Sequence, residues 1–257
     1  MKQLIKFLRT NLLAFRLYLL LAVISSVFYF VFAEPPSWII YSSLFMYFVF
    51  GCLGIVVTFH RNLTHRSYKI STVLENILTF FGTLAGTGSS IAWVNMHMLH
   101  HKYSDSPKDP HSPDNGIIKM FLLSYSVPNE LTKPAKALMR DRYHLFLHKY
   151  YNGIHIMTAT LLYLLFGLDI LFGFYVIPMI ITAIMSNMVN YLGHSHGYRS
   201  FNTKDNSTNS FIATILSFGE GWHNNHHKYP NTPNFGGRNW WEFDFSYQVI
   251  RLIQKKS

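Results

Sequence analysis

The chain has 257 residues, of which 49% are hydrophobic, 17% aromatic and 13% charged, and its formal net charge is +10. This composition is typical of a protein that lipid covers over part of its surface, and the length suits one domain over residues 1–257. No basic run alternates with aromatic residues, so nucleic acid is excluded as a partner and anionic lipid headgroups explain the charge better. Cys52 is the only cysteine, which excludes disulfides and cysteine metal clusters within the chain.

Four stretches of the chain are apolar, and a helix of about 20 such residues crosses a hydrocarbon core of about 30 Å. We therefore predict four membrane spans, at residues 14–33, 37–59, 152–168 and 170–193. Glu34 and two prolines separate the first two spans, and little more than Gly167 and Asp169 separates the last two. The spans are expected to form two hairpins.

The basic residues indicate how these hairpins are oriented. The two short turns contain no Lys or Arg, whereas the N-terminus, the central segment and the tail contain nearly all of them. The positive-inside rule then places both termini in the cytoplasm, and the inner membrane of a bacterium is the expected location. The expected fold class is an all-α membrane protein with a cytoplasmic helical cap formed by residues 60–151 and 194–257.

Within this cap, three segments have a recognisable local pattern. Residues 73–93 contain too few apolar side chains for a span, which favours an interfacial or re-entrant helix. Residues 106–116 contain three prolines and are expected to form a loop. Residues 131–150 are predicted to form one amphipathic helix on the surface.

Nine histidines fall on the cytoplasmic side in this topology, near the ends of two spans, where a single centre could collect them. They are His60, His65, His97, His100, His101, His194, His223, His226 and His227. Nine imidazoles are too many for one tetrahedral zinc, so two metal ions with four or five ligands each fit the count. The spacing does not identify the metal, because imidazole suits zinc, copper, iron and nickel.

Spacing within the clusters adds detail. Asn190 lies four residues before His194 and shares its helical face. His60 and His65 are five apart, which on an ideal α-helix of about 3.6 residues per turn separates their directions. Either the span frays there, or the two bind different metals. Other histidines are expected to have no metal role or are left outside the site: His111, His144, His148, His155 and His196.

Four motifs together resemble the membrane fatty acid desaturases, specifically the delta-9 acyl-CoA and acyl-lipid branch that includes the stearoyl desaturases. They are FHRNLTHRSY (59–68), HMLHHKYSDSPKDPHSP (97–113), NYLGHSHGYR (190–199) and GEGWHNNHH (219–227). The family is a group of oxidoreductases with four spans and a di-iron centre in a cytoplasmic cap. They use O2 and two external electrons to introduce a cis double bond into a saturated acyl chain.

This resemblance implies roles for particular residues. The nine histidines would be ligands of two iron ions, with Asn190 acting through a water molecule. Trp93, four residues before His97, would line the substrate tunnel at its bend, although ordinary packing explains it equally well. No side chain would need to act as an acid or nucleophile, because the metals carry the chemistry.

The chain also departs from the animal acyl-CoA enzymes. Asn95 and Met96 occupy the positions of an Arg-Asp pair that contacts coenzyme A in those enzymes, which favours an acyl group on a membrane lipid over acyl-CoA. We find no cytochrome b5 module after Trp241 and no flavin or nicotinamide fingerprint, so we expect a separate electron donor, a ferredoxin. Two other functions stay open: a di-iron lipid hydroxylase or ketolase on the same scaffold, and a membrane metal-binding or transport protein. The second is disfavoured because the spans contain almost no ionisable groups.

Overall fold

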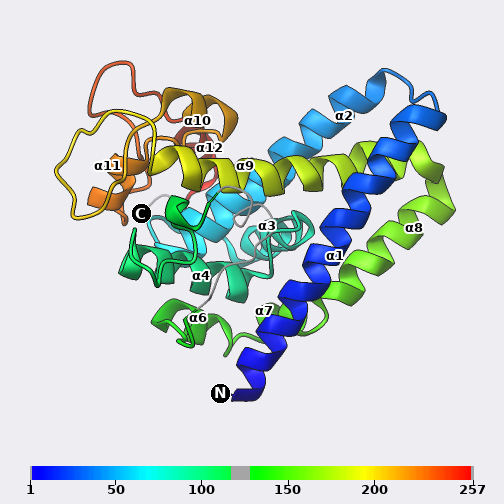
Figure 1. The fold of residues 1–257 in the computed structure, drawn as a ribbon, viewed down its shortest axis with the longest axis horizontal. Coiled ribbons are helices and arrows are strands. Elements are labelled where there is room, and N and C mark those ends of the chain that lie inside the picture. Colours follow the sequence, from blue (N-terminus) through cyan, green and yellow to red (C-terminus); the bar gives the residue numbers. More distant parts are fainter. Residues whose placement is uncertain (1, 117–127, 256–257) are drawn as a thin grey trace.

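The computed structural model of the protein describes residues 2–116 and 128–255, without the side chains of residues 2–16 and 115. Its named elements are all helices (Figure 1). They are α1 (Lys2–Phe32), α2 (Trp38–Tyr47), η1 (Phe48–Thr64), α3 (Thr72–Leu84), α4 (Ser90–Tyr103), η2 (Pro113–Asn115), α6 (Lys133–Leu138), α7 (Arg142–Lys149), α8 (Tyr151–Leu171), η3 (Phe172–Val176), α9 (Ile177–Gly193), α10 (Phe211–Leu216), α11 (His223–Lys228) and α12 (Phe245–Ile253).

The long helices form two hairpins whose turns lie at the same end of the molecule, on the right in Figure 1. The chain reverses after α1 at residues 34–36, and again inside α8 at Gly167, whose φ of 81° a side chain would disfavour. Tyr29 joins the two hairpins. Its ring stacks on Phe172 with centroids 4.2 Å apart, and its hydroxyl donates to Asp169 at 2.6 Å.

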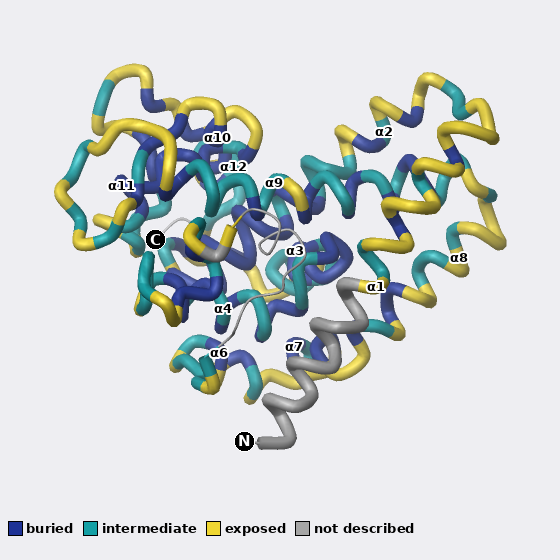
Figure 2. The backbone as a smooth tube through the Cα atoms, in the orientation of Figure 1, coloured by how far each residue is buried: buried dark blue, intermediate teal, exposed yellow. Residues whose placement is uncertain are grey.

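Two helical stretches are long and apolar enough to cross a membrane, Trp38–Thr64 and Tyr151–Gly193, and Leu17–Phe32 is a shorter apolar helix. Figure 2 shows that α2, α8 and the described half of α1 are largely exposed on their outer sides, whereas η1, α4 and α11, which carry most of the clustered histidines, are largely buried. The exposed apolar side chains include Phe28 and Val31 on α1 and Leu164 on α8. Apolar side chains exposed in this way fit a membrane-associated protein, because lipid would cover them.

The helix that begins at Trp38 changes its winding where it enters the core. From Phe48 to Thr64 it is a π-helix, in which backbone bonds join residues five apart. Side chains add bonds of the same spacing: the hydroxyl of Thr58 donates to the carbonyl of Leu53 at 2.8 Å, and that of Thr64 to Phe59 at 2.7 Å. The helix therefore continues past the predicted end of the span at residue 59.

A close contact between two glycines brings α3 against this π-helix. A Cβ added at Gly54 would lie 2.6 Å from the backbone nitrogen of Gly82, which no real side chain tolerates. Two residues without side chains are therefore needed where these backbones meet. The segment predicted as one helix at 73–93 is divided: α3 ends at Leu84, and a turn with positive φ at Gly86 and Gly88 leads into α4, which begins at Ser90.

The prediction of one helix over residues 131–150 is wrong. The structure has two short helices there, α6 and α7. Asp141 explains the break, because its carboxylate accepts from the backbone N–H groups of Tyr143 and His144 at 2.8 and 3.3 Å. An aspartate in this position caps the start of a helix and favours a new one over a continuous one.

Candidate metal centre

The structure brings the nine predicted histidines together in two groups. The five-histidine group consists of His60, His65, His97, His101 and His226, and the four-histidine group consists of His100, His194, His223 and His227. Within each group, the ligand nitrogens all lie within 4.8 Å of one another. Asn190 belongs to neither group, and its amide donates to the carbonyl of Ser186 at 3.2 Å.

The spacing of the Nε2 atoms suits metal coordination. In the four-histidine group, neighbouring Nε2 atoms form a closed ring with separations of 3.2, 3.1, 3.1 and 3.3 Å. In the five-histidine group, the separations along the series from His65 through His97, His101 and His226 to His60 are 3.1, 2.9, 2.9 and 3.1 Å. Two nitrogens bound to one ion at about 2.0–2.1 Å, with an angle of about 90–109° between them, lie about 2.9–3.4 Å apart. Each group therefore has the geometry of a ligand shell.

The π-helix explains why His60 and His65 can share a group although they are five residues apart. The N–H of His65 donates to the carbonyl of His60 at 3.1 Å, so one wide turn separates the two residues. The π-helical winding therefore brings the two histidines into one group, without fraying of the helix and without a different metal for each.

The two H-x-x-H-H motifs each contribute to both groups. On α4, His97 and His101 share a face and join the five-histidine group, while His100 joins the other. On α11 the assignment is reversed, since His223 and His227 join the four-histidine group and His226 joins the five. Spacings of three and four residues on a helix predict that the imidazoles of His223, His226 and His227 share one face. This prediction is wrong for His226, which joins the other group.

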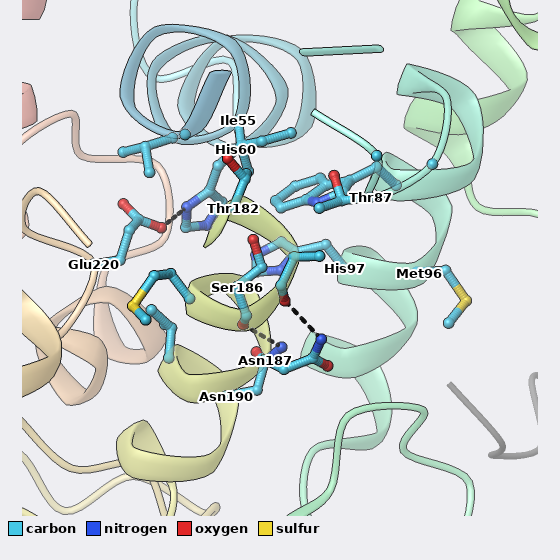
Figure 3. Close-up of a pocket in the computed structure, with 18 of the residues that line it drawn as sticks. Ile55, His60, Thr87, Met96, His97, Thr182, Ser186, Asn187, Asn190 and Glu220 are labelled. Atoms are coloured by element: carbon cyan, nitrogen blue, oxygen red, sulfur yellow. Dashed lines mark hydrogen bonds and ion pairs between the residues drawn. The ribbon is translucent and has the colours of Figure 1, made fainter. Parts of the chain in front are cut away.

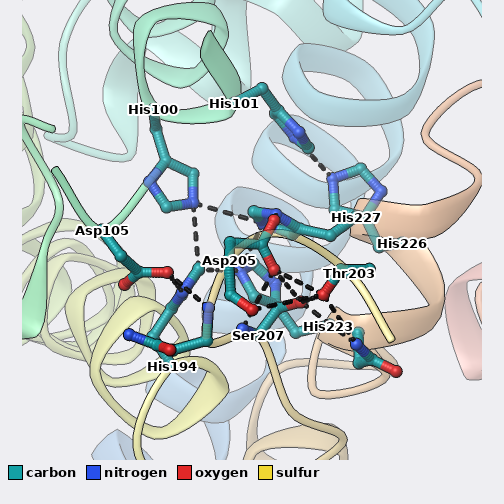
Figure 4. Close-up of polar contacts among 12 residues, drawn as sticks. His100, His101, Asp105, His194, Thr203, Asp205, Ser207, His223, His226 and His227 are labelled. Carbon is teal, nitrogen blue, oxygen red and sulfur yellow. Dashed lines mark hydrogen bonds and ion pairs between the residues drawn. The ribbon is translucent and has the colours of Figure 1, made fainter. Parts of the chain in front are cut away.

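Carboxylates hold four of these imidazoles from behind, as Figure 4 shows for Asp105 and Asp205. The Nδ1 atoms of the histidines contact acidic oxygens in the pairs His100–Asp109 at 2.9 Å, His194–Asp105 at 3.0 Å, His227–Asp205 at 2.8 Å, and His60–Glu220. An ionised carboxylate only accepts, so Nδ1 carries the proton and the Nε2 lone pair is free to bind a metal. The nine side chains thus fit a pair of metal ions.

These four acids were not among the sequence-predicted site residues. Signals for three of them exist: Asp105 and Asp109 follow the H-x-x-H-H motif closely, and Glu220 precedes His223 by three residues. Asp205 lies in a loop, and we find no spacing rule that connects it to His227.

A buried arginine lies behind the five-histidine group. The guanidinium of Arg61 donates to Glu220 at 2.8 and 3.2 Å and to Asp244 at 2.7 Å, and it stacks on the ring of Phe235 at 3.9 Å. Its side chain is completely buried. Arg61 therefore fixes the carboxylate that orients His60.

Burial lowers the pKa of several of the clustered imidazoles and so favours their neutral form. Burial first, and repulsion by neighbouring imidazoles second, hold the pKa of His97, His101 and His226 well below the ordinary value of 6.5. Burial would raise the pKa of Asp205, but its hydrogen bond to His227 and those from Ser207 and Thr203 lower it overall. Neutral imidazoles beside ionised carboxylates are the protonation states that metal binding requires.

A largely apolar cavity reaches the histidines from between η1, α4 and α9 (Figure 3). Its wall includes His60, His97 and His223 from the two groups, and also Asn190. Trp93 lines the cavity and stacks on His97, with ring centroids 5.0 Å apart and an angle of 18° between the rings. The expected tunnel residue thus lines the cavity and contacts one of the candidate metal ligands.

The remaining predicted positions lie outside both groups. His144 and His148 hydrogen bond to Ser90 and Ser89 at 2.8 and 2.6 Å, and His155 to the hydroxyl of Tyr175 at 2.5 Å. His111 contacts His100 with ring centroids 5.7 Å apart, and His196 is exposed. Asn95 anchors the backbone of residues 130–132. Its side-chain nitrogen donates to the carbonyl of Glu130 at 3.0 Å, and its side-chain oxygen accepts from the N–H of Thr132 at 2.8 Å.

Comparison with known proteins identifies the family. The fatty acid desaturase family model matches residues 36–253. The chain is 36% identical over 216 residues to the sn-1 stearoyl-lipid 9-desaturase of Anabaena variabilis, a match that covers 82% of this chain and 79% of that protein. It is 36% identical to the Delta-9 acyl-lipid desaturase 1 of Arabidopsis thaliana, over 79% of this chain and 68% of that protein. It is 34% identical to the Acyl-CoA C20 Delta5-desaturase of Anemone leveillei, over 87% and 72% respectively. The chain therefore belongs to the fatty acid desaturase family and is an oxidoreductase that acts on fatty acids.

Proposed function

We propose that this protein is an acyl-lipid desaturase that introduces a cis double bond at the delta-9 position of a saturated acyl chain. The observation that carries this proposal is the apolar cavity whose wall contains His60, His97 and His223. An acyl chain in such a cavity would bring one methylene pair beside two metal ions. Two relatives named as 9-desaturases support the bond position.

The proposed reaction converts –CH2–CH2– into –CH=CH–. One O2 takes up the two hydrogens of the substrate together with two external electrons and two protons, and two water molecules form. Two iron ions, held by the nine histidines and by Asn190 through a water, would supply the oxidising chemistry when bound.

The protein's own residues would orient the substrate and exclude water. The indole of Trp93 lies flat against His97, so it would fix the chain's path beside the five-histidine group. Buried side chains such as Phe235, whose ring lies 4.3 Å from that of His226, would keep water from the ligands. The pairs of Glu220 with His60 and Asp205 with His227 would hold the imidazoles in the orientation that binds metal.

We also propose that the chain is a single multi-pass domain with four spans at about residues 14–33, 37–59, 152–168 and 170–193. Both turns of the hairpins lie at the end opposite α11, and the basic residues concentrate at the other end, which supports cytoplasmic termini and a cytoplasmic cap over residues 60–151 and 194–257. A bacterial inner membrane would suit this orientation. Labelling of cysteines introduced at Glu34 and at Asn231 tests it, because the two should be reactive from opposite sides of the membrane.

A membrane lipid is proposed as the acyl carrier. The amide of Asn95 is engaged with the backbone of Glu130 and Thr132, and Met96 lines the cavity, so neither offers a charge to a coenzyme A headgroup. Relatives of both kinds are known, acyl-lipid and acyl-CoA, so the carrier is a testable choice. Product formed readily from added stearoyl-CoA, with none in intact phospholipid, would contradict it.

A separate acidic ferredoxin is proposed as the electron donor, because the net charge of +10 favours an acidic carrier. Turnover with an acidic ferredoxin should exceed that with a basic carrier, and the advantage should shrink as salt is raised. Equal rates with both carriers would contradict the electrostatic argument.

The central experiment is expression in a host that lacks this activity, followed by gas chromatography of the lipids with determination of the bond position. A new delta-9 double bond supports the proposal. A new hydroxyl group would identify a hydroxylase instead, and metal uptake into liposomes without an oxygen-dependent lipid product would indicate transport.

Matched variants connect the product to the histidine groups. His226→Ala removes a buried member of the five-histidine group and should abolish the product and lower the bound iron without unfolding the helices. His196→Ala removes an exposed histidine outside both groups and should leave product and iron unchanged. Full activity of His226→Ala would refute the assignment of the centre.

A further inference from the structure

The carboxylates behind the two histidine groups are unevenly distributed. Three of the four imidazoles in the four-histidine group contact an aspartate through Nδ1: His194 with Asp105, His100 with Asp109, and His227 with Asp205. Neither Asp105 nor Asp205 pairs with a lysine or arginine in the part of the chain that the structure describes. Arg199 approaches Asp205 only through the backbone carbonyl of that residue, at 2.8 Å.

The five-histidine group has a different surrounding. Among residues 2–116 and 128–255, Glu220 is the only acidic residue that forms an ion pair with one of its members, His60. The same carboxylate accepts two hydrogen bonds from the buried guanidinium of Arg61. The two carboxylates behind His60, Glu220 and Asp244, therefore share one guanidinium, whereas Asp105 and Asp205 form no ion pair with a lysine or arginine among the described residues.

This difference matters for the charge that each group can stabilise. A carboxylate that accepts from Nδ1–H increases the basicity of Nε2, so the imidazole donates its electron pair more strongly to a metal ion. The negative charge of the carboxylate also attracts the metal ion directly. Both effects favour a trivalent ion over a divalent one. A guanidinium near the other group acts in the opposite direction.

We propose that Asp105, Asp109 and Asp205 make the four-histidine group the position of the more highly charged metal ion. When one electron is removed from a pair of ferrous ions, the ferric ion is then the one bound by His100, His194, His223 and His227. This inference rests on the proposed di-iron function. It goes beyond that function by giving the two metal positions different redox properties.

Two isosteric substitutions test the inference because each removes a charge and keeps an oxygen that can accept from Nδ1–H. Asp205→Asn changes the four-histidine side, and Glu220→Gln is its matched counterpart on the other side. The purified diferrous protein is titrated with ferricyanide, which accepts the electrons, and the mixed-valence and diferric forms are followed by electron paramagnetic resonance and Mössbauer spectroscopy.

In the wild type we expect two separate one-electron steps. Asp205→Asn should move the first oxidation to higher potential more than the second, because it removes negative charge beside the ion that is oxidised first. Glu220→Gln should move mainly the second oxidation. An unchanged first step in Asp205→Asn, or equal shifts of both steps in the two variants, would overturn the proposal. A merely structural role of Asp205 would lower iron content and leave the potentials of the remaining centres unmoved.

A measurement on the wild type avoids variants that bind iron poorly. Metal-free protein is offered Ga3+ and Zn2+ together and analysed for both metals. The proposal predicts one Ga3+ and one Zn2+ per chain, and Asp105→Asn should weaken Ga3+ binding by at least about tenfold while Zn2+ binding changes less. Two Ga3+ or two Zn2+ per chain would contradict it. The proposed function fails separately, if the iron-loaded wild type makes no unsaturated product.

Discussion

Gly193 offers a direct test of the geometry of the four-histidine group. It is the last residue of α9, and a Cβ built there would lie 2.8 Å from Cδ2, 2.9 Å from Cγ and 3.1 Å from Cβ of His223. Carbon atoms in contact are about 3.5–4.0 Å apart, so Gly193→Ala requires His223 to move by about 0.7 Å. Rotation of the ring does not relieve the contact, because the Cβ of His223 is itself too close.

Metal–nitrogen bonds tolerate displacements of only about 0.2 Å, so a movement of this size should remove His223 from the ligand shell. We expect the metal content of Gly193→Ala to fall from two ions per chain to one, because only one of the two groups contains His223. Inductively coupled plasma mass spectrometry measures this, and circular dichroism checks that the helices remain.

Gly153→Ala is the matched control. Gly153 lies within α8, and a Cβ there meets nothing within 4 Å. The control should bind two metal ions and unfold at the same temperature as the wild type or slightly above it, because alanine favours a helix over glycine by about 1 kcal/mol. Gly193→Ala with two tightly bound metals would refute the inferred position of His223.

Three further substitutions have defined outcomes. Arg61→Met leaves Glu220 and Asp244 buried without their cation, so the free energy of unfolding should fall by about 3–5 kcal/mol, and a midpoint in thermal denaturation equal to that of the wild type would contradict this. Burial lowers the pKa of His148 to about 4, so the folded protein stays unprotonated there while the unfolded chain binds a proton below pH 6.5. Stability from this residue is therefore complete above pH 6.5 and is lost progressively as the pH falls towards 4, by up to about 3 kcal/mol. His148→Gln should flatten the dependence of the denaturation midpoint on pH between pH 4 and 6.5. An unchanged slope would count against a lowered pKa of His148. Gly54→Ala forces a methyl group against the backbone of α3, so the free energy of unfolding should fall by about 1–3 kcal/mol and the denaturation midpoint should fall with it. Gly153→Ala should not lower the midpoint. Similar midpoints for the two variants would argue against the close contact between η1 and α3.

The convergence of the histidines could be predicted because it depends on features that operate over long distances. The charge difference between turns and loops predicts that all nine lie on one side of the membrane, and their number favours two metal ions over one. The structure brings together the same nine residues.

The division into groups could not be predicted, because it depends on local geometry that composition does not specify. His60 and His65 share a group only because η1 is wound as a π-helix, and π-helices are too rare to assume from sequence. His226 and His223 join different groups although both lie on α11. An apolar pattern also predicts one helix over residues 131–150, whereas the cap formed by Asp141 divides it.

The carboxylates illustrate a different limit. Asp205 contacts His227 across 22 positions of sequence, and the loop that carries it has no periodicity. Its position is determined by tertiary contacts, for example the hydroxyls of Thr203 and Ser207, which donate to its carboxylate at 2.7 and 2.5 Å. Only the packed three-dimensional structure brings such residues next to a candidate ligand.

The reversed assignment of the two H-x-x-H-H motifs has a mechanical consequence. Because α4 and α11 each contribute histidines to both groups, the distance between the two groups is determined by about one turn of rigid helix on either side. A movement of either helix as a whole that opens one group must also distort the other, whereas the displacement of a single side chain such as His223 affects one group alone. The two metal positions should therefore form and fail together during folding, so that a chain with one helix misplaced has no partial centre that could react with oxygen without substrate.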